Sequence, residues 1–220
     1  MMGKLKKLTG YRLFLPLSCL IIVLLINLIT TPTFFRITIN NGVLYGYIID
    51  VINRASELVV LAVGMTLVVS ASAGTDISVG AVMAVAAAVC TRVLAGGEVS
   101  VNEYANPYVL AVLAALAAAV VCGGFNGLLV AKLKIQPMVA TLILFTAGRG
   151  ISQLVTNGQI TYIRVDGYKL LGNNIPGIPI PTPIFVAVIV VALTYILLKK
   201  TAMGMYIQSV GINERASRLV

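Results

Sequence analysis

The sequence predicts an all-α fold, a polytopic bundle of transmembrane helices with about six spans in this chain. Of the 220 residues, 59% are hydrophobic and only 10% are charged, which is more apolar surface than a soluble domain can bury. The apolar residues form long runs, and most of the basic residues flank these runs, as the positive-inside pattern of membrane spans requires.

The first predicted span, Leu13 to Ile29, follows a basic segment that contains Lys4, Lys6, Lys7 and Arg12. Thr31-Pro32-Thr33-Phe34 follows it instead of a small-residue cleavage site, so we expect a retained span with a cytoplasmic N-terminus. Residues 30–55 are mixed in character and are expected outside the membrane. An interfacial helix is predicted there over Ile48 to Arg54, and a turn at Asn41-Gly42.

Five further spans follow in order: about Glu57 to Ser70, Ile77 to Leu94, Val109 to Ala131, a span opened by Pro137, and Ile184 to Leu198. Basic pairs, Lys132 with Lys134 and Lys199 with Lys200, mark cytoplasmic turns. The third span has many alanines on its surface, which suits close helix packing in lipid. The long loop Asn157 to Pro183 is expected outside and to be functional or disordered.

The stretch Gly64 to Gly80, GMTLVVSASAGTDISVG, predicts a helix that breaks deep in the membrane. An apolar run gives way to small and polar residues at Ser70 to Thr75, and a carboxylate stands beside the break. Broken helices often line substrate paths in transporters, which makes four residues candidates for such a path: Gly74, Thr75, Asp76 and Ser78. The alternative is a tight connection between two helices, with Asp76 or Ser78 capping the second.

Two polar residues within the later apolar runs are further candidates for the path. Asn126 lies between Gly123 and Gly127, a GxxxG pair that lets another helix pack closely. Its amide suits either an interhelical hydrogen bond or the wall of a pore. Arg149, near the outer end of its span, suits snorkelling, a structural ion pair or a role in translocation.

Several kinds of chemistry have no motif in the sequence. There is no histidine, and Cys19, Cys90 and Cys122 stand singly in apolar runs, without zinc-ligand spacing. No GxxxxGK[ST] phosphate loop and no nucleophile–base constellation occur, so we predict no catalytic site, no metal and no cofactor bound by this chain. The net charge of +9 follows from topology and gives no reason to expect nucleic acid.

Three segments resemble the membrane permeases of monosaccharide-importing ABC transporters, the ribose type. Residues 64–89 are similar to the family's signature segment, close to GMTLVIxTGGIDLSVG, although this chain has one glycine fewer at the break. Residues 127–159 are similar to a second conserved pattern that contains Arg149. Residues 201–220 match a third, in which five residues fall into place: Thr201, Gly204, Gly211, Asn213 and Ala216. Residues 40–55 and 134–150 most resemble galactofuranose permeases.

The resemblance implies that residues 1–220 form a single permease domain, which family members continue beyond Val220. It implies a bacterial inner-membrane location and the following partners: an ABC ATPase subunit that carries the ATP, a periplasmic sugar-binding protein, and a second permease subunit as homo- or heterodimer. Residues 201–220 are then a cytoplasmic coupling segment, with Gly204 and Gly211 as flexible points. Asn213 is expected to cap a short helix over 214–220 that contacts the ATPase, the alternative being a frayed tail at the membrane surface.

Two rival functions stay open at this point. A secondary transporter or channel driven by an ion gradient generally needs ionisable groups within the membrane, and here Asp76, Glu57 and Arg149 are the candidates. The second rival is that the chain is a non-transporting fragment of a permease.

Overall fold

The computed structural model describes residues 13–31, 33–40, 42–165, 167–168, 172, 175 and 177–217, and not the side chains of residues 40, 214 and 215. Several residues used in the predictions therefore lie outside the described residues: Lys4, Lys6, Lys7, Arg12, Pro32, Asn41, and residues 218–220.

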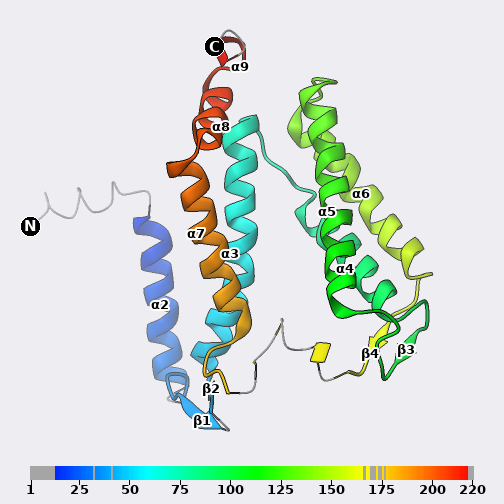
Figure 1. Cartoon of the computed structure of the whole chain (residues 1–220). Coiled ribbons are helices and arrows are strands. Elements are labelled where there is room, and N and C mark those ends of the chain that lie inside the picture. Colours follow the sequence, from blue (N-terminus) through cyan, green and yellow to red (C-terminus); the bar gives the residue numbers. More distant parts are fainter. Residues whose placement is uncertain are drawn as a thin grey trace, which may run out of the picture. The chain divides into compact units, whose positions relative to one another are not determined.

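The described part of the chain is mainly helical (Figure 1). Its helices are α2 (Phe14–Thr30), α3 (Tyr47–Ser72), α4 (Val79–Leu94), α5 (Tyr108–Ala131), α6 (Pro137–Val155), α7 (Thr182–Lys200), α8 (Ala202–Ile212) and α9 (Glu214–Ser217). Four of them, α3, α5, α6 and α7, are long and apolar enough to cross a membrane, and α2 and α4 are shorter apolar helices. The predicted fold class, a helical membrane protein, is confirmed.

The chain forms two compact units, of which the first comprises residues 1–55 and 176–180. It contains α2 and an antiparallel hairpin of β1 (Thr38–Asn40) and β2 (Val43–Tyr45). Gly42 has φ +77°, so the turn predicted there is present, although the strands beside it were not predicted. The backbone N–H of Leu44 donates to the carbonyl oxygen of Pro179 at 3.0 Å, which ties the hairpin to the end of the long loop.

Helix α3 runs without interruption from Tyr47 to Ser72. The separate interfacial helix predicted over Ile48 to Arg54 is therefore wrong, because these residues form the first turns of α3. No proline or glycine occurs between Tyr47 and Gly64 to stop the helix after Arg54. At 1.5 Å per residue, α3 is about 39 Å long, which is more than the hydrocarbon core of a bilayer requires.

The core of the second unit lies where α4 packs against α5 and α6, which run side by side (Figure 1). Small side chains make this contact close: Ala81, Val85 and Ala88 of α4 are buried, as is Ala140 of α6. A Cβ atom placed on Gly148 of α6 would lie 3.0 Å from the Ala81 Cβ. The predicted small-residue face of the third span thus packs against another helix, as expected for helices in lipid.

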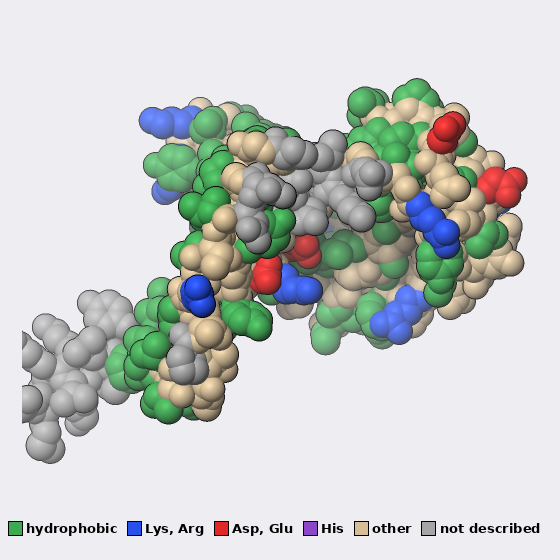
Figure 2. Space-filling view, turned by 90° about the horizontal axis from the view of Figure 1, so that it is seen from below, with side chains coloured by type: hydrophobic (Ala, Val, Ile, Leu, Met, Phe, Trp, Pro, Cys, Tyr) green, Lys and Arg blue, Asp and Glu red, His purple; other side chains and the backbone are tan. Residues whose placement is uncertain are grey.

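The outer surface of the helices is apolar. Large hydrophobic side chains such as Val120 and Leu193 are more than half exposed. On the face that Figure 2 shows, charged side chains are scattered among hydrophobic ones. A soluble protein would not expose so much apolar surface, whereas lipid would cover it.

The loop between α4 and α5 and the loop between α6 and α7 are joined by a short parallel β-ladder. Strand β3 (Ser100–Val101) pairs with β4 (Tyr162–Ile163), which lies in the long loop predicted after α6. Beside the ladder, the Tyr108 ring lies 5.9 Å from that of Tyr104 and 6.4 Å from that of Tyr168, centroid to centroid. Burial in this cluster raises the pKa of the Tyr168 phenol above its ordinary value.

Candidate functional site

The break predicted after Ser70 begins two residues later, at Ala73. Helix α3 ends at Ser72, and Ala73 has φ +52°, a left-handed conformation that glycine adopts more easily than alanine. The Ser72 hydroxyl donates to the Val68 carbonyl at 2.8 Å and accepts from the Gly74 N–H at 3.2 Å. It therefore satisfies one of the backbone groups that the break frees.

The irregular segment between α3 and α4 is held against the start of α6. A Cβ atom on Gly74 would lie 2.6 Å from two carbon atoms of the Pro137 ring, so only glycine fits against that ring without a shift. The backbone N–H of Ile77 donates to the Thr141 hydroxyl at 3.2 Å. Pro137 is the first residue of α6, as predicted, and Thr141 lies one turn further along.

Three side chains form a chain of hydrogen bonds at the start of α4. The Asn126 amide donates from Nδ2 to the Ser78 hydroxyl at 2.9 Å, and that hydroxyl donates to Asp76 Oδ1 at 2.7 Å. The same Oδ1 accepts from the Ser78 backbone N–H at 2.7 Å. Of the two residues predicted to cap α4, Asp76 holds the freed N–H, whereas Ser78 makes no side-chain cap bond.

Burial makes this chain of hydrogen bonds important for the local structure. Ser78 is 1% exposed and Asn126 is 7% exposed. A buried hydroxyl or amide is costly unless it is hydrogen-bonded, and the interhelical bond predicted as one role of Asn126 meets that need. The Oδ1 atom of Asn126 is also buried and has no hydrogen-bond partner among the described residues.

Relative to the helices, the break lies near one end of the α4–α6 bundle, while its predicted depth in the membrane stays a prediction. It contacts the first residues of α6 through Pro137 and Thr141, and Asn126 is five residues from the C-terminal end of α5. Helix α3 continues through Ser72 before it breaks, since serine and alanine at 70–72 are compatible with a helix.

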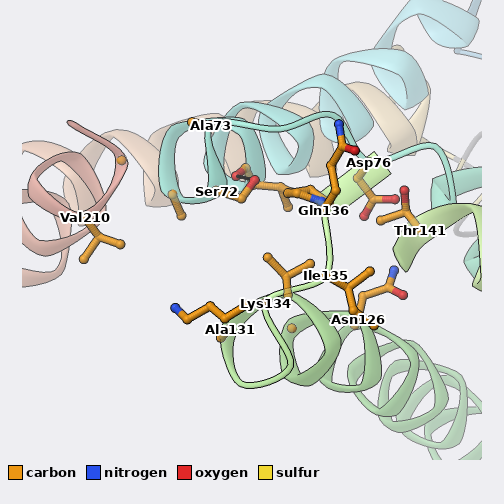
Figure 3. A pocket seen from close by; sticks show the side chains of 17 residues that line it. Ser72, Ala73, Asp76, Asn126, Ala131, Lys134, Ile135, Gln136, Thr141 and Val210 are labelled. Atoms are coloured by element: carbon orange, nitrogen blue, oxygen red, sulfur yellow. Dashed lines mark hydrogen bonds between the residues drawn. The ribbon is translucent and has the colours of Figure 1, made fainter. Parts of the chain in front are cut away.

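A cavity of about 720 Å³ opens beside the break (Figure 3). The end of α3, the C-terminal half of α5, the turn before α6, the start of α6 and the end of α8 all contribute to its lining. Asp76, Asn126 and Thr141 lie together at one end of the cavity in Figure 3, and Val210 lies at the other. Of the candidate path residues, the cavity thus includes Asp76 and Asn126, but not Thr75, Gly74 or Ser78.

Gly123 and Gly127, predicted to pack against another helix, line this cavity instead of a helix contact in the described part of the chain. A Cβ atom on either glycine would meet nothing within 4 Å. No described residue of this chain packs closely against the pair, so the predicted helix packing is not observed among the described residues.

The segment after α7 forms a helix that the sequence did not predict. Gly204 and Gly211, expected to be flexible points, both lie within α8, and both are closely packed. A Cβ atom on Gly204 would collide with the Leu198 carbonyl, and one on Gly211 with the Ser70 carbonyl. The expectation of flexibility is wrong because these glycines allow close contacts between backbones.

The cap predicted at Asn213 is present. Its Oδ1 atom accepts from the Ala216 backbone N–H at 3.1 Å, and the one-turn helix α9 follows. Ala216 is exposed, and residues 218–220 of the predicted short helix lie outside the described residues.

Comparison with known proteins identifies the family. Residues 47–220, which include the break, the cavity and α8, match the model of the permease component of the branched-chain amino acid transport system. The chain belongs to this permease family. No solved structure matches the chain.

Several curated relatives are permeases whose names include a sugar. The chain is 44% identical, over 92% of its length, to the galactofuranose transporter permease protein YtfT of Escherichia coli, and covers 56% of that protein. It is 38% identical, over 97% of its length, to the fructose import permease protein FruF of Bifidobacterium longum, covering 59%. The ribose import permease protein RbsC of Escherichia coli is 33% identical over 92% of the chain, with 59% covered. The chain thus spans less than two thirds of these relatives.

The remaining candidate, Arg149, is not brought to the break. It is exposed on α6, and its guanidinium lies 4.8 Å from the centroid of the Phe145 ring, one turn away on the same helix. This arrangement is compatible with the snorkelling interpretation of Arg149, while its role in transport stays a prediction.

Two contributors to the site were missed in the sequence. Thr141 holds the irregular backbone at Ile77, and Pro137 receives Gly74. A hydroxyl within the apolar run after Pro137 was the available signal for Thr141, but its partner lies 64 residues away in sequence.

In the described part of the permease no three histidine, cysteine or acidic side chains gather as a metal site would need, and the three cysteines are free.

Proposed function

We propose that the protein of which this chain forms part is the membrane-spanning subunit of an ABC importer for a monosaccharide. The observation that carries the proposal is the identity of 33–44% with sugar permeases, which extends over 92% of the chain or more. The permease supplies the path, and ATP binding and hydrolysis on a partner subunit switch which side of it is open.

Galactofuranose is the substrate that we propose first. The identity to the galactofuranose permease is 44%, against 38% for the fructose permease and 33% for the ribose permease. The resemblance of residues 40–55 and 134–150 to galactofuranose permeases points to the same sugar.

The partners that we propose are an ABC ATPase subunit, a periplasmic sugar-binding protein and a second permease subunit in the bacterial inner membrane. The chain has no phosphate-binding loop of its own, so the ATP must be bound elsewhere. Residues 201–217, with the exposed Ala216 on α9, are the segment that we assign to the ATPase contact. The N-terminus is then cytoplasmic, because the positive-inside rule places the basic segment before the first span on the same side as the basic pairs Lys132 with Lys134 and Lys199 with Lys200.

The function is tested by transport in reconstituted vesicles. The full-length permease that contains this segment is purified with its ATPase subunit and binding protein. ATP-dependent uptake of labelled galactose, fructose and ribose is then measured. We expect uptake of at least one sugar that requires ATP and the binding protein, with galactose taken up fastest through its furanose form.

A matched measurement uses vesicles without ATP but with a proton or sodium gradient. Uptake that follows the gradient and ignores ATP would contradict the importer and favour a secondary transporter. In such a protein, ionisable side chains within the membrane carry the coupling ion.

A further inference from the structure

We propose that the cavity beside the break is a site at which the permease binds one monosaccharide, with Asp76 and Asn126 as its polar wall. This inference rests on the proposed function and adds the place of the substrate to it. The cavity volume of about 720 Å³ lies within the range of small-molecule sites.

The polar wall has hydrogen-bonding capacity that the protein does not use. Asn126 is 7% exposed, lines the cavity, and has a buried Oδ1 atom without a partner among the described residues. Its Nδ2 atom is held by Ser78, so the direction of the amide is fixed. A small shift of the Asn126 side chain would expose Oδ1 to the cavity, and a sugar hydroxyl that then donates to it would satisfy an atom that is otherwise costly to bury.

Asp76 gives the same wall a strong acceptor. Its Oδ1 atom already receives two hydrogen bonds from Ser78, and the half-buried carboxylate lines the cavity. A carboxylate can accept more than two hydrogen bonds, so it can bind further hydroxyl groups. Figure 3 shows Asp76, Asn126 and Thr141 together at one end of the cavity, which places several hydrogen-bonding groups within the reach of one ring.

The rest of the lining suits an uncharged molecule. Val68, Val130 and Ile135 are apolar, and they can contact the C–H faces of a sugar ring. Asp76 and Lys134 are the charged residues of the lining, one of each sign. Their charges balance, so the cavity does not favour an anion such as a sugar phosphate over a neutral sugar.

Two glycines keep one side of the cavity open. Gly123 and Gly127 lie on the α5 face that borders it, and a Cβ atom on either would meet no atom within 4 Å. Gly124 has equally free space around it, but it does not line the cavity. This gives a matched pair on one helix, since a side chain at 127 enters the cavity and one at 124 does not.

The test uses cysteine protection in the full-length permease assembled with its ATPase subunit and binding protein. In a background with Cys19, Cys90 and Cys122 replaced by alanine, Gly127→Cys and Gly124→Cys are each treated with N-ethylmaleimide in vesicles. The sugar that the vesicles transport is added during turnover. We expect the sugar to slow modification of Gly127→Cys at least fivefold and to leave Gly124→Cys unchanged within twofold.

A second variant tests the polar wall. Asn126→Ala in the Gly127→Cys background should raise the sugar concentration for half-maximal protection about tenfold, and modification without sugar should stay as fast as before. If Asn126→Ala disrupts assembly, seen by size-exclusion chromatography, Asp76→Asn replaces it and should raise that concentration severalfold.

The outcomes separate this proposal from the function on which it rests. Uptake of sugar without protection of Gly127→Cys would contradict the binding site in the cavity but not the importer function. The same conclusion follows if Gly127→Cys reacts only after denaturation, because another helix then covers this face. Protection by leucine and not by sugars would overturn the monosaccharide as the occupant. Uptake of no sugar would overturn both proposals.

Discussion

Gly74 lies directly against the ring of Pro137, so that a methyl group on Gly74 would come within 2.6 Å of two ring carbons. The first residue of α6 therefore fixes the irregular segment that joins α3 to α4. Pro137 is rigid, and the backbone of α6 behind it cannot easily move away. The break in α3 is thus a packed element of the structure.

The first prediction follows from this contact. Gly74→Ala should destabilise the full-length permease by about 1–3 kcal/mol, the usual cost of overpacking, and reduce sugar uptake. The control is Gly80→Ala, because Gly80 lies in α4 with no atom within 4 Å of an added Cβ. That change should be neutral or slightly stabilising. Thermal unfolding of the purified protein in detergent measures both, and equal effects of the two changes would contradict the packed contact.

The second prediction concerns Asp76, whose Oδ1 atom accepts two hydrogen bonds from Ser78. Asp76→Ala should impair uptake more than Asp76→Asn, because asparagine retains an oxygen that can cap α4. Loss of the cap alone is worth about 1 kcal/mol. Uptake and protein level are measured in vesicles for both variants. Wild-type uptake by both would leave Asp76 without a role.

The third prediction concerns Ala73, which has φ +52°. The related permeases were expected to carry a glycine pair at the break, and here alanine takes the strained position. Ala73→Gly should therefore raise the stability by up to about 1 kcal/mol. Ala62→Gly, within α3, should lower it by about 1 kcal/mol. A fall in melting temperature for Ala73→Gly would mean that the left-handed conformation is not what limits this position.

The fourth prediction tests the topology with cysteines in the long loop. In a background without Cys19, Cys90 and Cys122, Tyr168→Cys should react with an impermeant thiol reagent from outside. Tyr162→Cys on β4, where the side chain is about half exposed, should react faster. Lys132→Cys, at the end of α5, should react only after the membrane is opened. The reverse pattern would invert the orientation of the permease.

The sequence was sufficient for the long apolar helices because their apolar runs end close to Pro, Gly or Lys, whereas it did not predict α8. Pro137, for example, begins α6 as predicted. The errors arose where local patterns compete with long-range contacts. No proline or glycine between Tyr47 and Gly64 stops the helix, and the prediction of a separate interfacial helix rested on a change in polarity alone.

The site was predicted in part for the same reason. Asp76, Ser78 and Asn126 were singled out as polar groups in apolar surroundings, but their pairing depends on how α4 and α5 pack. The permissiveness of glycine predicts a flexible point at Gly211, and only the structure shows this residue against the Ser70 carbonyl. A contact across 141 residues leaves no local signal in one sequence.

The last prediction concerns that contact, which joins α8 to the final turns of α3. A Cβ atom on Gly211 would collide with the Ser70 carbonyl, so a larger residue must push α8 away from the broken helix. In the importer that we propose, the α8–α9 segment meets the ATPase, and Gly211 then links that contact to the break. Gly211→Val should let the full-length permease insert normally but uncouple it, with sugar-stimulated ATPase activity reduced about tenfold or more.

The control is Gly64→Val, in α3, where an added Cβ would meet nothing within 4 Å and stimulation should stay within about twofold of wild type. Cross-linking from Ala216→Cys to the ATPase subunit reports whether the segment still docks. Because Asn213 caps α9 independently of Gly211, the cross-link should persist in Gly211→Val while the stimulation is lost. Unchanged stimulation, together with no cross-link from Ala216→Cys, would show that residues 201–217 do not couple the permease to ATP hydrolysis.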